Sequence, residues 1–215
     1  EADAHRQMDM ALDAGINFVD AAEMYPVNPI AKETIGRTEE YLGNWNAANA
    51  ARRESYVLAT KHSGAGMVHV RNGAPITGQS IPEAIENSLR RLQTEYIDLY
   101  QFHWPNRGSY MFRQNWNYAP SGKNTADVLD NMSECLEVLQ AQVDKGNIRA
   151  FGLSNESAWG TAQWLRLAEA GAHVICLDRP DDDGPTSQLA QRIGGSVLLL
   201  DVTDKDAPRK ISDYV

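Results

Sequence analysis

Residues 16–26 of the chain read INFVDAAEMYP, and this stretch decides the fold. The apolar residues Ile16, Phe18 and Val19 follow a glycine, a pattern that predicts a short buried strand. Asp20 falls where this strand should end, and Tyr25 follows in the loop. A carboxylate at a strand end with a phenol just beyond it is an unusual pair for a structural loop, so this stretch is a candidate site.

Two later strand-like runs also lead into titratable side chains. Residues 56–60 read YVLAT and run into Lys61, and residues 97–102 read IDLYQF and run into His103. Asp20, Tyr25, Lys61 and His103 therefore stand at or just past the ends of successive predicted strands. Such a set of groups can carry proton chemistry.

The rest of the chain alternates between predicted helices and strands. This alternation implies a parallel sheet with crossover helices, and hence the α/β class. The predicted helices cover residues 2–14, 31–42, 80–93, 125–145, 157–170, 186–193 and 205–214. The predicted strands cover residues 16–20, 56–60, 97–102, 148–153, 173–178 and 196–200.

A β/α barrel and an open doubly wound sheet both fit this alternation. The candidate catalytic side chains stand at the ends of consecutive strands. This favours the barrel, because active sites of β/α barrels lie at the carboxyl ends of the strands. A complete barrel needs eight strands in about 250 residues, and fewer are predicted before Gly171. We therefore expect a partial TIM (β/α)8-type barrel that lacks its first and last parts. The long aromatic loop over residues 104–124 is expected to be functional.

Composition and charge narrow the class of partner. Twenty basic and 29 acidic residues give a net charge of -9 at pH 7, which argues against nucleic acid or an anionic membrane surface as the main partner. No apolar run approaches the roughly 20 residues of a membrane span. The two cysteines, Cys135 and Cys176, do not suggest a disulfide framework. We expect a cytoplasmic protein.

Residues 3–171 resemble the aldo-keto reductase superfamily, in particular its Tas-like and potassium-channel β-subunit-like branch. The matching strings are AGINFVD at residues 14–20 with Tyr25, ATK at 59–61, SLRRL at 88–92, YIDLY at 96–100, HWP at 103–105 and IRAFGLSN at 148–155. The resemblance implies a TIM barrel and the NADPH-dependent reduction of aldehydes and ketones.

The resemblance also assigns catalytic roles. Tyr25 would be the general acid that protonates the carbonyl oxygen of a small-molecule substrate. Because a free phenol with a pKa near 10 is a reluctant donor, a nearby charged Lys61 would lower the pKa of Tyr25. Asp20 would pair with Lys61 and orient it, and His103 would hydrogen-bond the substrate carbonyl.

Two further roles concern ligand binding. Ser154 and Asn155 match the family positions that hold the nicotinamide carboxamide of NADPH. Trp104 and the aromatic residues of the following loop would wall the substrate pocket.

Residues 173–215 resemble a different family, the short-chain dehydrogenases, and are similar to 3-oxoacyl-carrier-protein reductases. The resemblance predicts a short βαβα Rossmann-like tail in which Asp178 matches an acid that binds a ribose. We therefore predict a truncated aldo-keto reductase barrel over residues 1–171 and a dehydrogenase-like fragment over residues 172–215, which together form a chimera.

Two other hypotheses remain open from the sequence. One is a non-catalytic, NADPH-binding regulatory subunit, in line with the resemblance to channel β-subunits. The other is an inactive chimeric fragment whose unpaired strand edges and open apolar interior favour aggregation or a homo-oligomer.

Overall fold

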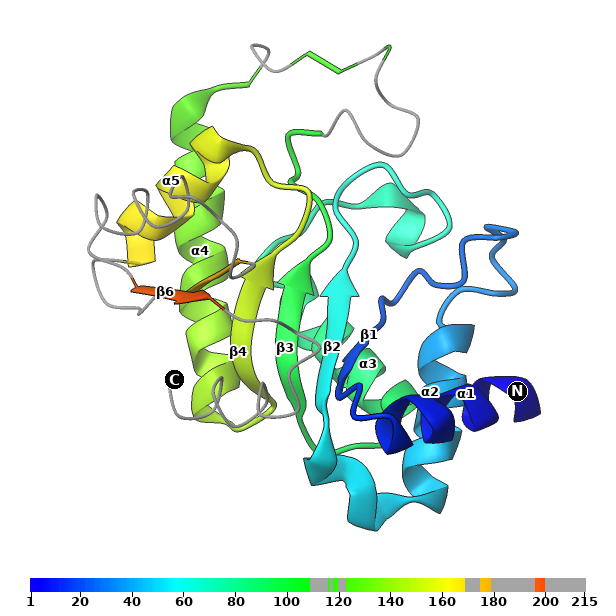
Figure 1. Ribbon diagram of the computed structural model, residues 1–215. Coiled ribbons are helices and arrows are strands. Elements are labelled where there is room, and N and C mark those ends of the chain that lie inside the picture. Colours follow the sequence, from blue (N-terminus) through cyan, green and yellow to red (C-terminus); the bar gives the residue numbers. More distant parts are fainter. Residues whose placement is uncertain (109–115, 117, 120–122, 169–174, 179–195, 200–215) are drawn as a thin grey trace. The chain divides into compact units, whose positions relative to one another are not determined.

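The computed structural model describes residues 1–108, 116, 118–119, 123–168, 175–178 and 196–199 (Figure 1). The chain forms two compact units. One unit comprises residues 1–18, 54–57 and 157–215, and the other comprises residues 19–53 and 58–156. The second unit holds every side chain that the sequence assigns to catalysis or ligand binding by resemblance to aldo-keto reductases.

A four-stranded sheet forms the centre of the second unit. Its order is β1 (Phe18–Asp20), β2 (Val57–His62), β3 (Ile97–Phe102) and β4 (Ile148–Leu153). The pairs β2/β3 and β3/β4 are parallel, with Lys61 opposite Gln101 and Phe102 opposite Leu153, and the arrowheads of these strands point the same way in Figure 1. The predicted parallel α/β sheet is therefore confirmed.

Three helices connect these strands: α2 (Arg37–Ala48), α3 (Ser80–Leu92) and α4 (Thr125–Asp144). Helix α2 packs on α3, α3 packs on α4, and α4 packs on β4. Gly43 allows α2 to approach α3 closely, because a Cβ atom at this position would lie 1.9 Å from the carbonyl oxygen of Arg91. Two 3₁₀ turns, η1 (Ala50–Ser55) and η2 (Arg71–Gly73), precede β2 and α3.

Two predictions for the start of the chain need correction. Ile16 is 51% exposed and lies before β1, in which Phe18 and Val19 are only half-buried, so the predicted strand is shorter and less buried than expected. The helix predicted over residues 31–42 begins only at Arg37. Its N-cap residue is Gly36, with a φ of 81° that favours glycine. The side chain of Glu39 then fixes the helix, since it accepts hydrogen bonds from Thr60 on β2 and Arg91 on α3.

Helix α4 matches its predicted range, but the residues that it buries differ from those expected. Asn124 caps the helix, because its side-chain oxygen accepts a hydrogen bond from the backbone N–H of Ala126. The apolar spacing of the sequence predicts a buried stripe of Leu129, Met132, Leu136, Leu139 and Val143. In the structure Met132 and Leu139 are buried, together with Cys135 and Gln142, whereas the other three residues of the stripe are half-buried. The buried face of the helix thus includes a glutamine that the apolar spacing did not indicate.

The first unit contains helix α1 (Ala2–Asp13), helix α5 (Ala158–Ala168) and the parallel strand pair β5 (Ile175–Asp178) and β6 (Ser196–Leu199). These elements fall where helices and strands were predicted. The predicted helices over 186–193 and 205–214, and the predicted boundary at residue 171, lie outside the described residues. Among the helices that the structure describes, none has the length and apolar character needed to span a membrane.

Candidate active site

Asp20 and Lys61 form an ion pair at the ends of two neighbouring strands. Asp20 is the last residue of β1 and Lys61 lies near the end of β2. Lys61 Nζ lies 2.5 Å from Asp20 Oδ2 and also donates to the carbonyl oxygen of Ala21 at 2.8 Å. The side chain of Lys61 is only 5% exposed. This buried cation is thus held by groups at the end of β1, and its pairing with Asp20 is the one that the resemblance implied.

Tyr25 lies in the loop after β1, close to both the lysine and the histidine of the predicted set. Lys61 Nζ lies 5.3 Å from the centroid of the Tyr25 ring. The ring of His103 meets the same ring edge-on, with the centroids 5.5 Å apart. The structure therefore brings together Asp20, Tyr25, Lys61 and His103, although the chain separates them widely.

The pKa of Tyr25 differs from the sequence prediction. A nearby lysine was expected to lower this pKa, but in the structure it is raised above its usual value of 10.0, first by burial and then by the negative charge of Asp20. Lys61 lies over the ring and donates to Asp20 and Ala21. The consequence is that the phenol of Tyr25 stays protonated at neutral pH and is available as an acid.

His103 follows β3 and is buried together with the residue after it. Its backbone N–H donates to the carbonyl oxygen of His62 at 2.8 Å. Burial, with the positive charge of Lys61, lowers the pKa of His103 to about 4. The imidazole is therefore neutral at physiological pH, and a neutral imidazole can donate a hydrogen bond to a carbonyl oxygen.

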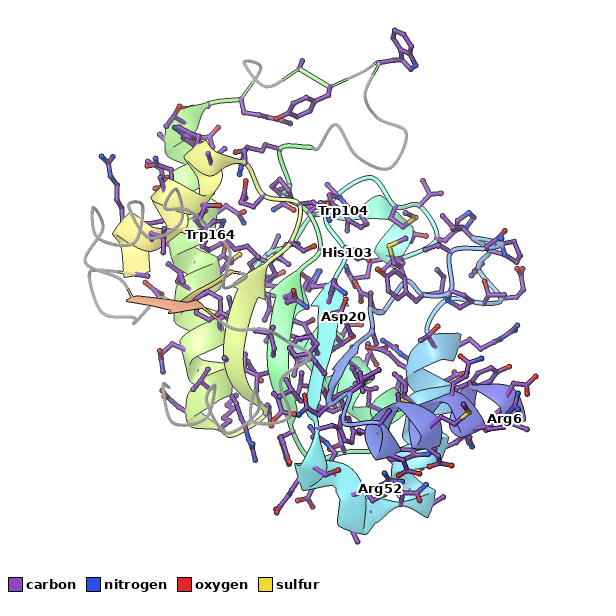
Figure 2. The ribbon with its side chains drawn as sticks, in the orientation of Figure 1. Arg6, Asp20, Arg52, His103, Trp104 and Trp164 are labelled. Carbon is purple, nitrogen blue, oxygen red and sulfur yellow. The ribbon has the colours of Figure 1, made fainter. Side chains whose placement is uncertain are left out.

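Trp104 is fully buried beside His103. Its ring centroid lies 5.0 Å from that of His103, and its indole N–H donates to the carbonyl oxygen of Ala65 at 3.0 Å. Trp104 also packs with Ala22 and Met24, on the segment that leads to Tyr25. Figure 2 shows Asp20, His103 and Trp104 towards the carboxyl ends of the strands. Contact of Trp104 with a substrate stays a prediction, and its visible role is to support His103.

Ser154 and Asn155 follow β4 and lie next to the histidine. The backbone N–H of Ser154 donates to the carbonyl oxygen of Phe102 at 2.8 Å. The side-chain amide of Asn155 donates to the carbonyl oxygen of His103 at 2.9 Å and to Ser154 Oγ at 3.0 Å. An adjacent hydroxyl and amide at this edge supply both donors and acceptors, which is the chemistry that a carboxamide requires.

The aromatic loop after Trp104 lies mostly outside the described residues, Tyr110 and Phe112 included. Trp116 is described and is 90% exposed. Its part in a substrate pocket stays a prediction.

Two groups of polar residues near the site were not anticipated. Gln101 donates to Asp20 Oδ1 at 3.0 Å. Its position opposite Lys61 in the strand register would have indicated this contact, had the register been known. The second group is the cluster of Glu23, His62 and Arg71, in which Arg71 pairs with Glu23. Glu23 stands out in the sequence as a charge within an apolar run, whereas Arg71 gives no such signal.

The model of the aldo/keto reductase family matches residues 1–178. The chain belongs to the aldo/keto reductase family. The family match extends past residue 171, where the aldo-keto reductase part was predicted to end. The predicted resemblance of residues 173–215 to short-chain dehydrogenases is not supported by this match and stays a prediction.

Several aldo-keto reductases and related proteins show the same relationship. Protein tas of Escherichia coli is 41% identical over 175 residues, which is 79% of this chain and 48% of that protein. The 6-dehydroglucose reductase of Novosphingobium aromaticivorans is 34% identical over 154 residues, which is 72% of this chain and 42% of that protein. The chain thus spans about half the length of the curated relatives it matches.

A solved structure supports the fold. The aldo-keto reductase AKR11C1 from Bacillus halodurans, in its holo form, is 27% identical and superposes with a TM-score of 0.60. The match covers 92% of this chain and 56% of that protein. The parallel α/β arrangement of this chain is therefore that of an aldo-keto reductase, in line with the predicted TIM-barrel type.

Proposed function

We propose that the chain carries the catalytic centre of an NADPH-dependent oxidoreductase that reduces aldehydes or ketones to alcohols. The observation that carries this proposal is the arrangement of Lys61 and His103 around the Tyr25 ring, with Asp20 holding Lys61. A protonated phenol whose ring lies near a cation and a neutral imidazole is suited to protonate an oxygen that gains negative charge. A relative named 6-dehydroglucose reductase supports a small-molecule carbonyl compound as substrate.

In the proposed mechanism the side chains of this chain bind, orient and protonate the substrate. A nicotinamide, held by Ser154 and Asn155, would supply the hydride that reduces the carbonyl carbon. His103 donates a hydrogen bond to the carbonyl oxygen and places it near Tyr25. Tyr25 transfers its proton to that oxygen, and the charge of Lys61 stabilises the phenolate that remains. A proton from solvent then restores the phenol.

We assign the carboxamide of the cofactor to Ser154 and Asn155. The donors and acceptors of these two side chains fit a carboxamide, and they lie at the same strand edge as His103. The choice of NADPH over NADH rests on the family resemblance alone.

A titration of NADPH into the 215-residue chain, followed by cofactor fluorescence, tests this assignment. We expect saturable binding that weakens by roughly tenfold in Asn155→Ala, because about one hydrogen bond to the carboxamide is lost. Asn44→Ala on α2 is a control, because the Asn44 side chain accepts a hydrogen bond from Gln93, away from the carboxyl ends of the strands. Binding that is absent, or equal in both variants, would overturn the assignment.

A further inference from the structure

Arg71 joins the loop that carries Tyr25 to the end of strand β2. Its Nη1 lies 2.5 Å from Oε2 of Glu23, and its Nη2 donates to the carbonyl oxygen of Ser63 at 3.0 Å. Glu23 is two residues before Tyr25, and Ser63 follows β2 directly. One guanidinium group thus bridges two segments that each hold part of the candidate active site.

Glu23 is the anchor of the Tyr25 loop in this bridge. It is 4% exposed, and its Oε1 accepts a hydrogen bond of 2.5 Å from the backbone N–H of Ser63. Its own backbone N–H donates to the carbonyl oxygen of Lys61 at 3.1 Å. Tyr25 then turns back, since its N–H donates to the carbonyl oxygen of Ala22 at 3.0 Å. The chain segment from Glu23 to Tyr25 is therefore short, and its first residue is held in place.

The backbone around Arg71 adopts an unusual conformation. Arg71 and Asn72 have φ values of 46° and 55°, and Gly73 follows with a φ of 78°. Left-handed conformations in successive residues are unfavourable for residues that carry a Cβ atom, and they persist only where the surroundings impose them. The ion pair with Glu23 is a contact that can impose this conformation, and the turn places the side chain of Arg71 next to the loop.

The neighbouring histidine leaves Arg71 as the cation of this cluster. His62 Nδ1 lies 2.9 Å from Arg71 Nη2. Burial lowers the pKa of His62 to about 4, with Arg71 acting in the same direction and Glu23 opposing it. The imidazole is neutral at physiological pH, so the buried Glu23 depends on Arg71 for its positive partner.

We propose that Arg71 is a positioning residue for the general acid: by tying Glu23 to the end of β2, it sets the place of Tyr25 beside Lys61 and His103. This inference rests on the proposed function in so far as Tyr25 is the general acid. The geometric part, that Arg71 fixes the environment of the Tyr25 phenol, can be measured without any turnover.

The decisive measurement is the pKa of the Tyr25 phenol in the 215-residue chain. It is followed by NMR on labelled tyrosine, with the signal assigned through Tyr25→Phe. In Arg71→Met the buried Glu23 loses its ion pair and the loop is held less firmly, so the phenol becomes more solvated and moves away from Asp20, and its pKa falls towards 10. If the chain is active, kcat falls by roughly tenfold with little change in KM, because the acid is misplaced while substrate contacts remain.

Arg91→Met is a matched control. Arg91 makes a similar ion pair with the buried Glu39, at 2.6 Å, and its side chain is 19% exposed, as is that of Arg71. We expect Arg91→Met to lower stability but to leave the pKa of Tyr25 unchanged. If both variants lower stability and neither moves the pKa of Tyr25, Arg71 is merely structural and the proposal is overturned.

Two further outcomes separate this proposal from the proposed function. A wild-type chain without carbonyl reductase activity, but with a Tyr25 pKa that responds to Arg71→Met alone, contradicts the proposed function and supports the positioning role. If Arg71→Met does not fold, Arg71→Lys takes its place, because it keeps the charge but loses the paired hydrogen bonds to Glu23 and Ser63. A smaller fall of the Tyr25 pKa is then expected, and an unchanged value overturns the proposal.

Discussion

Lys61 Nζ and Asp20 Oδ2 lie 2.5 Å apart, across two neighbouring strands and 41 residues of sequence. The lysine side chain is 5% exposed and that of the aspartate is 46% exposed. The pair therefore combines a cation enclosed by protein with a carboxylate that reaches solvent. This arrangement fixes Lys61 over the ring of Tyr25, while the negative charge of Asp20 acts on the same phenol.

The first prediction concerns the charge of Asp20. Asp20→Asn removes one of the two causes that raise the pKa of Tyr25, so this pKa should fall, although burial keeps it above 10.0. NMR titration of the labelled tyrosine measures the change. Asp98→Asn is the control, because Asp98 also pairs with a buried arginine, Arg53, but near the start of β3. An equal shift in both variants would contradict a direct effect of Asp20.

The second prediction concerns the packing beneath His103. A Cβ atom at Gly64 would lie 2.4 Å from both Cδ1 and the carbonyl oxygen of Trp104, so Gly64→Ala must displace this residue. We expect a loss of about 1–3 kcal/mol in the free energy of unfolding, typical of overpacking, with a change in tryptophan fluorescence. Gly152→Ala is the control, since its Cβ atom would lie 3.3 Å from the flexible side chain of Leu99.

Urea denaturation of both glycine variants measures the effect. If Gly64→Ala is as stable as Gly152→Ala and has the fluorescence of the wild type, the close contact with Trp104 does not exist in solution.

The third prediction concerns stability and pH. Burial lowers the pKa of His62 from 6.5 to about 4 in the folded chain, so the unfolded chain binds the proton more tightly. The contribution of His62 to the free energy of unfolding is therefore fully present above pH 6.5 and is lost as the pH falls towards 4. A difference of this size corresponds to about 3 kcal/mol. His103, whose pKa is also lowered to about 4, acts in the same direction.

The free energy of unfolding, measured between pH 4 and 7 by urea denaturation, tests the third prediction. His62→Gln should lose less stability over this range than the wild type does. His69→Gln removes an exposed imidazole and should follow the wild-type curve. A wild-type stability that stays constant down to pH 4 would show that neither His62 nor His103 is held neutral by burial.

Much of the fold was predictable from local pattern. The apolar runs before Lys61 and His103 correspond to β2 and β3, and the residues of β4 match their prediction. The start of α2 was not predictable, because it depends on the left-handed Gly36 and on contacts of Glu39 with Thr60 and Arg91. These contacts join distant segments, and no local pattern encodes them.

The candidate site was predictable in its members but not in its electrostatics. The family strings indicated Asp20, Tyr25, Lys61 and His103, and strand ends at one edge of a parallel sheet explain why they meet. The predicted direction of the Tyr25 pKa shift was wrong, because burial and the orientation of Lys61 are properties of the folded chain. Arg71 was missed for the same reason, since its partner Glu23 lies 48 residues away.

The most direct test of Tyr25 as the general acid of a carbonyl reductase is turnover by the purified chain and by its Tyr25→Phe variant. NADPH oxidation is followed with a panel of aldehydes and ketones, and cofactor binding is titrated in parallel. We expect that the wild type reduces at least one carbonyl compound, and that Tyr25→Phe loses roughly 10²-fold or more of kcat while it binds NADPH as the wild type does. A variant that reduces the same compound at the wild-type rate would show that Tyr25 is not the general acid.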